Sequence, residues 1–343
     1  MAPDPLIRPP VELGAASRRA ADADPPRGRR GGGVASALAR LRERYPRLPA
    51  VARAGLLVVI FGSLVGFLAT QWNRLPEFDW RFSPAWLVLS GIAVGALYVG
   101  QGELWRLILR LLGAPTERRA ARAAYAKPLL ARYVPTSVLL VVGRVVLAER
   151  LGVQKRVTLA SIAYELGLAV VSAVIAASYF VIRLPGLAEV EARYAILLVI
   201  PIALVALHPR AFGPMADYAL RKVGSEPLAM TIPFSRVLAL VALYLLTWVA
   251  VGLGLFAFAS ALHPVEARDL LYIAASYPVG FCVSVLAFIL PGGLGARDVT
   301  LATALAGVLP AAVAAAIAIA FRLFQTAIEL VYVAVSTALA RLR

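Results

Sequence analysis

Long runs of apolar residues alternate with short polar stretches along most of this chain. Because a helix that crosses a bilayer needs about 20 mostly apolar residues, the runs predict membrane-spanning helices. We therefore expect an all-α fold, a polytopic membrane helical bundle of about eight transmembrane helices with additional re-entrant or broken helix segments. The expected spans are residues 54–73, 82–102 with an extension to 112, 157–182, 194–209, 237–262, 270–290, 298–309 and 311–340.

The same pattern divides the chain into two parts. Residues 1–50 are polar and rich in arginine, proline and glycine, so we expect a disordered basic cytoplasmic tail without a cleavable signal peptide. The tail is either a solvated leader or a segment that contacts anionic lipid head groups. Residues 54–340 form the expected membrane domain.

The distribution of lysine and arginine predicts the orientation of the chain. Residues 1–53 carry 11 of them, residues 106–156 carry 11 and residues 210–236 carry 4, whereas the alternate loops carry one or two each. Cytoplasmic loops hold the excess of positive charge in membrane proteins, so eight crossings with both termini in the cytoplasm fit this pattern. Because these charges are clustered in a few loops, the net charge of +16 indicates a membrane protein rather than a protein that binds nucleic acid. Alanine, arginine and glycine are abundant, which indicates a GC-rich bacterial genome. We therefore expect the protein in the bacterial plasma membrane.

Composition excludes several classes of protein. Hydrophobic residues make up 61% of the 343 residues and charged residues 16%, whereas soluble domains are about 45–50% apolar and about 25% charged. The single cysteine, Cys282, cannot form an internal disulfide, and we expect no metal site with only two histidines, His208 and His263. No phosphate-binding P-loop pattern and no nucleophile motif is visible. These observations favour a role without ATP hydrolysis, catalysis or a cofactor.

Two segments interrupt the helical pattern. Residues 133–143 are too short to span a bilayer and lie between basic flanks, so we expect a re-entrant segment that Pro135 and Gly143 would allow to follow an irregular path. A second break, at residues 291–295, has a proline and three glycines, which forbid a regular helix interior. Its breaking residues are Pro291, Gly292, Gly293 and Gly295.

Arg297 and Asp298 follow the second break, at the start of the next expected helix. The helix dipole favours an anion at this end, and the exposed amides of a helix start can bind a phosphate. Two interpretations stay open, a phosphate site and a tight loop that joins two helices. The two breaks also share an order of residues that suggests an internal repeat of the kind found in transporters. The order is Tyr133, Pro135 and Arg144 in the first region, and Tyr277, Pro278 and Arg297 in the second.

Ionisable side chains inside the expected spans are costly and usually functional. Glu103 and Arg106 are three residues apart and can pair on one helix face, either as a packing clasp or as part of a substrate site. Glu165 lies near the middle of its expected span. We expect Glu165 to be neutral or paired with a cation, with Arg322 of the last helix as the natural partner.

The last long helix carries a polar stripe that consists of Arg322, Gln325, Thr326 and Glu329, which share one face at about 100° per residue. Such a stripe should face the bundle interior, where it forms either a polar cavity or contacts that hold helices together. Guanidinium groups bind phosphate in a forked geometry, so a cavity would suit an anionic lipid head group whose tails stay in the bilayer. The candidate cavity residues are Arg144, Glu165, Arg297, Asp298, Arg322 and Glu329.

The stretch LPGGLGARDVTLATALAGV, followed by AIAFRLFQTAIEL, resembles the flippase-like transmembrane domain of the lysylphosphatidylglycerol synthase family. The family shows a proline and glycines, then Gly-x-Arg-Glu, then an arginine in the last long helix. Pro291, Gly292, Gly293, Gly295, Arg297 and Arg322 match it, and Asp298 stands where Glu is usual. Pro135, Arg144 and Glu165 match an earlier motif, although Val142-Gly143 replaces its Gly-Glu and Leu166 replaces its second arginine.

The resemblance covers roughly residues 54–340 and implies translocation of a lipid between leaflets, or a supporting role in envelope lipid or glycolipid assembly. Bifunctional family members add a cytosolic aminoacyl-transfer domain, whose reaction we do not expect of this chain. Three functions stay open. They are a protein that translocates or binds an anionic phospholipid or polyprenyl lipid, a membrane enzyme of the glycosyltransferase type, and a non-catalytic partner of envelope-synthesis enzymes. Association into a homo-oligomer is compatible with each.

Overall fold

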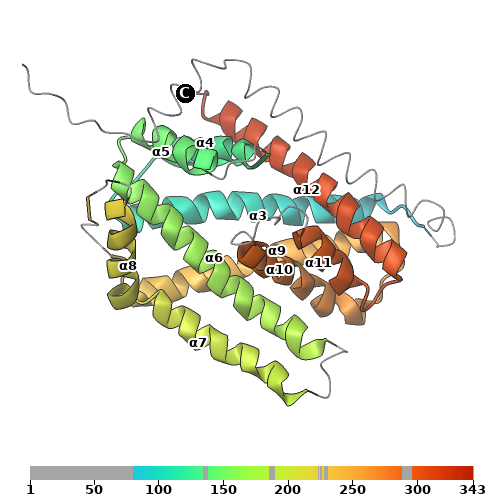
Figure 1. Cartoon of the computed structure of the whole chain (residues 1–343). Coiled ribbons are helices and arrows are strands. Elements are labelled where there is room, and N and C mark those ends of the chain that lie inside the picture. Colours follow the sequence, from blue (N-terminus) through green and yellow to red (C-terminus); the bar gives the residue numbers. More distant parts are fainter. Residues whose placement is uncertain are drawn as a thin grey trace, which may run out of the picture. The chain divides into compact units, whose positions relative to one another are not determined.

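The computed structural model describes residues 80–133, 138–184, 190–222, 224, 226–227, 231–287 and 296–342 (Figure 1). All regular elements in these ranges are helices, which confirms the expected all-α class. The helices are α3 (Pro84–Leu111), α4 (Arg118–Leu129), α5 (Val138–Glu149), α6 (Lys155–Arg183), α7 (Ile196–Ala206), α8 (Pro209–Lys222), α9 (Phe234–Leu262), α10 (Leu270–Ala287), α11 (Ala296–Leu305) and α12 (Ala311–Leu339). Short 3-10 turns occupy Leu130–Tyr133, Glu191–Ala195 and Ala267–Asp269.

Five helices of the described part are long and apolar enough to cross a membrane. They are α3, α6, α9, α12 and the segment Ala267–Leu286, which contains α10. A bent pair, Arg193–Ala206 and Pro209–Lys222, meets at 67° and would make a sixth crossing if it acts as one span. The expected span at 54–73 and the tail at 1–50 lie outside the described residues.

The expected crossing at residues 298–309 is wrong as a separate span. Its helix, α11, has 10 residues. At 1.5 Å per residue such a helix rises about 15 Å, roughly half the thickness of the hydrocarbon core. The chain then turns through Gly307 and starts α12 after Pro310, whose ring suits a helix start. The count of about eight crossings is therefore not confirmed.

Helices α3 and α9 pack against each other in opposite directions. At the start of α3 the amides of Arg81 and Ser83 donate to the carbonyls of Leu262 and Ala261, 2.9 Å away at the end of α9. About two turns further along α3, the Ser90 hydroxyl donates to the Gly254 carbonyl at 2.7 Å. Two long helices of the bundle are thereby held antiparallel.

Eight of the ten described α-helices form two sets with the same order of elements, and α7 and α8 lie between the sets in the sequence. In each set a long helix, α3 or α9, precedes a pair of helices joined at a break, α4 and α5 or α10 and α11, and a second long helix, α6 or α12, follows. The sets exchange contacts, since α4 packs against α12 and α10 packs against α6 (Figure 1). Because α3 and α9 are antiparallel, the paired helices that follow them approach from opposite ends of the bundle. This arrangement supports the internal repeat that the sequence suggests.

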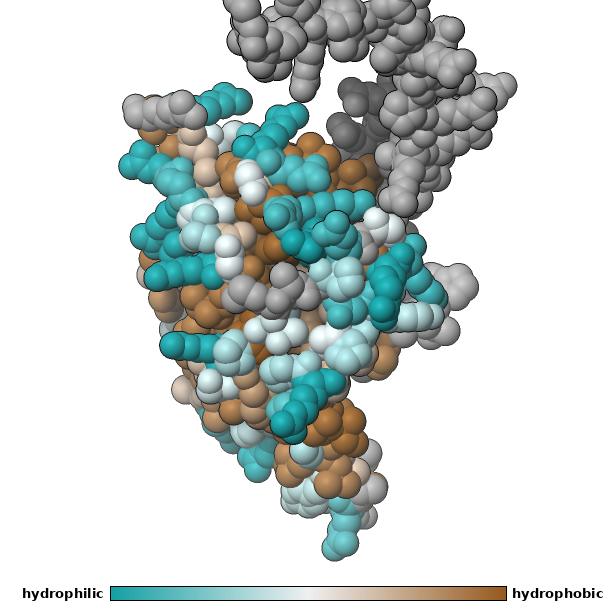
Figure 2. Space-filling model, turned by 90° about the vertical axis from the view of Figure 1, so that its left-hand side faces the viewer, coloured by the Kyte–Doolittle hydropathy of each residue, from teal (hydrophilic) through white to brown (hydrophobic). Residues whose placement is uncertain are grey.

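One end of the bundle is markedly more polar than the apolar helix surfaces. Figure 2 views the bundle from the side of α5 and α8, and hydrophilic side chains gather there over an otherwise apolar surface. Large apolar side chains on α7 and α3, such as Leu198, Ile202 and Ile92, are at least 65% exposed. Outward-facing apolar side chains on long helices suit contact with lipid tails rather than with water.

A glycine lets α9 and α10 approach closely, and this contact yields a test of the packing. A Cβ at Gly252 would lie 2.7 Å from the Ala274 carbonyl oxygen, so we expect Gly252→Ala to destabilise the protein by about 1–3 kcal/mol. The matched control is Gly95→Ala on α3, where no atom lies within 4 Å and stability should be unchanged or slightly higher. Thermal unfolding of the full chain in detergent measures both, and equal melting temperatures would contradict the described α9–α10 contact.

Candidate functional site

Arg144 and Glu165 form a buried ion pair between α5 and α6. Only 3% of the Arg144 side chain and 18% of the Glu165 side chain are exposed. The guanidinium of Arg144 lies 4.4 Å from the ring centre of Tyr125 and 5.5 Å from that of Trp105. A planar cation stacked on aromatic faces and paired with a carboxylate is stabilised in surroundings where a lone charge would be costly.

Hydrogen bonds tie this pair to α3 and α4. The Tyr125 hydroxyl lies 3.1 Å from Glu165 Oε1 and 3.3 Å from Gln101 Oε1, and its single proton can serve one of the two at a time. The Trp105 indole donates to the Ser161 hydroxyl at 2.9 Å. Arg144, Glu165, Tyr125, Trp105 and Gln101 therefore form one polar group, the Arg144 station, contributed by four helices.

Two buried polar atoms beside the Arg144 station have no hydrogen-bond partner among the described residues. They are Nε of Arg144 and the hydroxyl of Tyr244, a residue of α9 that interacts electrostatically with Arg144, Glu165 and Tyr125. An unmet buried donor carries a desolvation penalty of about 1–3 kcal/mol, which a polar ligand or water would remove. The station therefore has capacity for one more polar group.

Arg297 organises a second group, the Arg297 station, on the other set of helices. Its guanidinium contacts the Tyr277 hydroxyl of α10, donates to Gln325 Oε1 of α12 at 2.8 Å and lies 4.4 Å from the Tyr277 ring centre. The Tyr277 hydroxyl donates to the same Gln325 oxygen at 2.8 Å. Asp298, next to Arg297 on α11, forms an ion pair with Arg322 of α12.

The two stations have the same construction. In each, an arginine on the helix after a break stacks over a tyrosine of the helix before the break, at 4.4 Å. In each, that tyrosine hydroxyl contacts a side-chain oxygen of the following long helix, Glu165 or Gln325. The sequence suggested Tyr133 for the first station, but the tyrosine under Arg144 is Tyr125.

A polar path joins the two stations through α3 and α12. Gln325 and Glu329 are 8% and 2% exposed and lie one turn apart on α12, so these two residues of the predicted polar stripe face inward, whereas the Arg322 side chain is 33% exposed. The Tyr98 hydroxyl of α3 donates to Glu329 at 2.8 Å, and Gln101 of the Arg144 station lies one turn further along α3. The predicted residues thus meet in two stations, with polar side chains on neighbouring turns of α3 and α12 between them, rather than in a single cluster.

The expected pairing of Glu165 with Arg322 is wrong. Glu165 pairs with Arg144 and accepts from Tyr125, while Arg322 pairs with Asp298. The reason is that the short helices α5 and α11, which pack against α6 and α12, supply a nearer opposite charge. Of the residues expected to break the helices, Gly143 lies inside the regular helix α5, so the expected irregular path at this position is wrong. The others lie outside the described residues. They are Pro135, Pro291, Gly292, Gly293 and Gly295.

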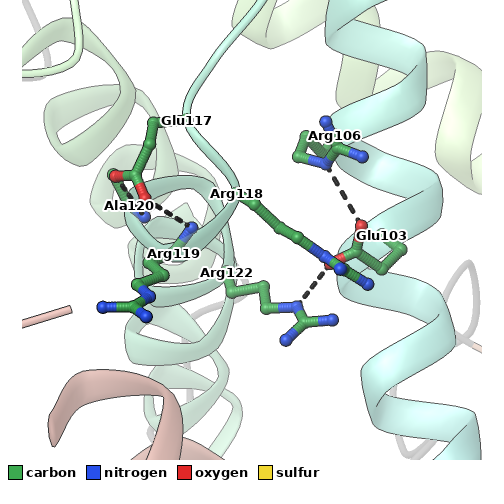
Figure 3. Close-up of polar contacts among 7 residues, drawn as sticks. All are labelled: Glu103, Arg106, Glu117, Arg118, Arg119, Ala120 and Arg122. Atoms are coloured by element: carbon green, nitrogen blue, oxygen red, sulfur yellow. Dashed lines mark hydrogen bonds and ion pairs between the residues drawn. The ribbon is translucent and has the colours of Figure 1, made fainter. Parts of the chain in front are cut away.

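Glu103 pairs with Arg106 as expected, but it also binds two arginines of α4 (Figure 3). Arg118 lies 3.0 Å from Glu103, and Arg122 forms a closer ion pair with the same carboxylate. The basic, alanine-rich sequence of α4 was the signal for this contact. That stretch was expected to be a cytoplasmic loop, so its helix was not predicted. Four tyrosines beside the charged residues were not predicted either. They are Tyr98, Tyr125, Tyr244 and Tyr277.

The described residues contain no group of three histidine, cysteine or acidic side chains that could hold a metal ion. No protein-family model matches the chain, and no curated protein or solved structure matches it significantly. The class that the fold defines is that of an all-helical protein with several helices able to span a membrane.

The Arg144–Glu165 pair predicts a double-mutant signature. Removing one partner leaves a buried charge, so Arg144→Met should lower stability by about 3–5 kcal/mol, and adding Glu165→Gln should restore more than half of the loss. Arg268→Met is the control, because the Arg268–Glu266 pair is 77% and 66% exposed and is worth about 0–1 kcal/mol. Thermal unfolding in detergent gives the coupling, and simple additivity of the two substitutions would contradict a direct buried pair.

Proposed function

We propose that this protein binds an anionic phospholipid or polyprenyl lipid by its phosphate group and translocates it across a bacterial plasma membrane for envelope assembly. The observation that carries the proposal is the pair of matching arginine stations, one on each set of helices. A charged arginine side chain inside the bilayer is costly unless it is paired with an opposite charge or with hydrogen-bond acceptors. Such residues mark substrate pathways in membrane proteins.

The stations suit a phosphate by their chemistry. A guanidinium presents five donors in a planar fork, and the Glu165 carboxylate does not use all those of Arg144, whose Nε has no partner among the described residues. A phosphate that arrives at Arg144 competes with Glu165 for the guanidinium and can accept from the two unmet donors, Arg144 Nε and the Tyr244 hydroxyl. The tyrosine ring keeps the arginine in place while its anionic partner is exchanged.

The opposite approach of the two broken helix pairs supports movement between leaflets. Transporters with inverted repeats place substrate groups at discontinuous helices and expose them alternately to each side. In this protein the α4–α5 pair would serve one leaflet and the α10–α11 pair the other, with the polar path through Tyr98, Gln101, Gln325 and Glu329 between them. The resemblance of the 291–322 region to the lysylphosphatidylglycerol synthase membrane domain is consistent with this role.

Leaflet-resolved transport tests the proposal. In vesicles containing the purified chain and a fluorescent phosphatidylglycerol, Arg297→Lys should slow transfer between leaflets about tenfold or more, because lysine keeps the charge but loses the fork and the ring contact. Arg144→Gln combined with Glu165→Gln should do the same without leaving a buried charge. Arg268→Lys, at an exposed arginine, is the matched control and should transfer at the rate of the unmodified protein.

A second lipid distinguishes transfer that depends on the head group from non-specific movement of lipids between leaflets. A fluorescent phosphatidylcholine of the same chain length should move more slowly than phosphatidylglycerol in the unmodified protein and should be insensitive to Arg297→Lys. Transfer of phosphatidylglycerol at an unchanged rate in both station variants would refute the assignment of the arginines to substrate.

The expected orientation yields a separate prediction. With Cys282 replaced by serine, Arg268→Cys should react with a membrane-impermeant maleimide on intact cells, because the α9–α10 connection is expected outside. Arg150→Cys, between α5 and α6 and also exposed, should react only after the membrane is opened, because basic connections stay in the cytoplasm. Labelling of both positions from the same side would contradict the opposite approach of the two helix pairs.

A further inference from the structure

A groove outside both stations runs between α3 and α12 and ends at α4. It has a cavity volume of about 310 Å³ and an almost wholly apolar lining. Its wall on α12 consists of aliphatic side chains such as Val331, Val335 and Leu339, which are 58%, 51% and 41% exposed. Arg119 and Arg122 of α4 lie at one end. The groove is therefore apolar along its length and basic where it meets α4.

Small residues create the space. Gly91 and Gly95, one turn apart on α3, form part of the lining. A Cβ at Gly95 would meet no atom within 4 Å, so the space above it is open. A Cβ at Gly91 would lie 3.6 Å from Phe324, in ordinary contact. The missing side chain at Gly95 thus leaves room for an apolar chain beside α12.

The basic end carries an excess of positive charge. Arg106, Arg118, Arg119 and Arg122 gather around α4 and the adjoining part of α3 with two carboxylates, which leaves four positive charges against two negative ones (Figure 3). Glu103 takes three of the arginines, and Glu117 accepts from the first amides of α4. Among the described residues the Arg119 guanidinium makes one hydrogen bond, from Nη1 to the Leu342 carbonyl at 3.0 Å, so most of its donors stay available.

We propose that this groove binds one anionic phospholipid, with its phosphate at Arg119 and Arg122 and an acyl chain over Gly95. Charge complementarity at the α4 end selects an anion, and the exposed apolar wall selects a hydrocarbon chain over a soluble anion. The basic segment 106–156 is expected on the cytoplasmic side, where anionic lipids attract such clusters. This site is separate from the two stations and binds lipid whether or not the stations translocate it.

Retention of phosphatidylglycerol measured by native mass spectrometry tests the site. The full chain, purified in a neutral detergent and exposed to phosphatidylglycerol, should retain one tightly held lipid. Arg119→Gln combined with Arg122→Gln should reduce that retention about tenfold or more, because two charge-assisted contacts are lost. Glu103 keeps Arg106 and Arg118 in this variant, so no carboxylate is left unpaired.

A second variant tests the apolar half without touching a charge. Gly95→Phe fills the groove and should reduce retention to a similar extent. Its matched control is Ile92→Phe, on the same helix at a position 65% exposed and outside the groove lining, which should retain lipid normally. Arg268→Gln is the charge control.

The outcomes distinguish the occupants of the groove. Loss of retention in both groove variants, with melting temperatures and transport at the two stations unchanged, supports the lipid site. Normal retention in both variants overturns it. A drop in melting temperature for Gly95→Phe with lipid retention unchanged also overturns it, because the retained lipid then does not occupy the space over Gly95.

Discussion

The antiparallel contact of α3 and α9 is the constraint on which the rest of the described structure depends. Main-chain bonds from Arg81 and Ser83 and the Ser90–Gly254 bond fix their relative direction. Each long helix then delivers the chain to a different end of the bundle, where a broken helix pair follows. Because α4 packs on α12 and α10 packs on α6, each against a long helix of the other set, reversing one direction would leave these two helices without their partners.

The sequence predicted the long helices well. The long, mostly apolar runs at 82–112, 157–182, 237–262 and 311–340 correspond to α3, α6, α9 and α12, because length and apolarity alone define such helices. Short or polar helices were harder to predict from the sequence. The basic, alanine-rich residues of α4 resemble a loop when read alone, and its helix is stabilised by burying Tyr125 and several alanines against neighbours that sequence cannot identify.

The candidate site was predicted in its residues but not in its contacts. Helical periodicity indicated correctly that Gln325 and Glu329 face inward, since periodicity reports on one helix at a time. The partners of Glu165 and Arg322 depend on which helices meet, and no spacing along the chain encodes that. The tyrosines under Arg144 and Arg297 were missed for a related reason, because a lone aromatic residue in an apolar run looks like any other lipid-facing or core side chain.

The contact between α4 and α12 also sets an order of assembly. Arg119 of α4 bonds to the carbonyl of Leu342, a residue 223 positions later, and α4 packs along the last helix. During synthesis the arginine-rich helix α4 therefore lacks this neighbour until the residues of α12 have left the ribosome. The early helices can be inserted one after another, but the α4–α5 pair gains its last contacts only when α12 packs against α4.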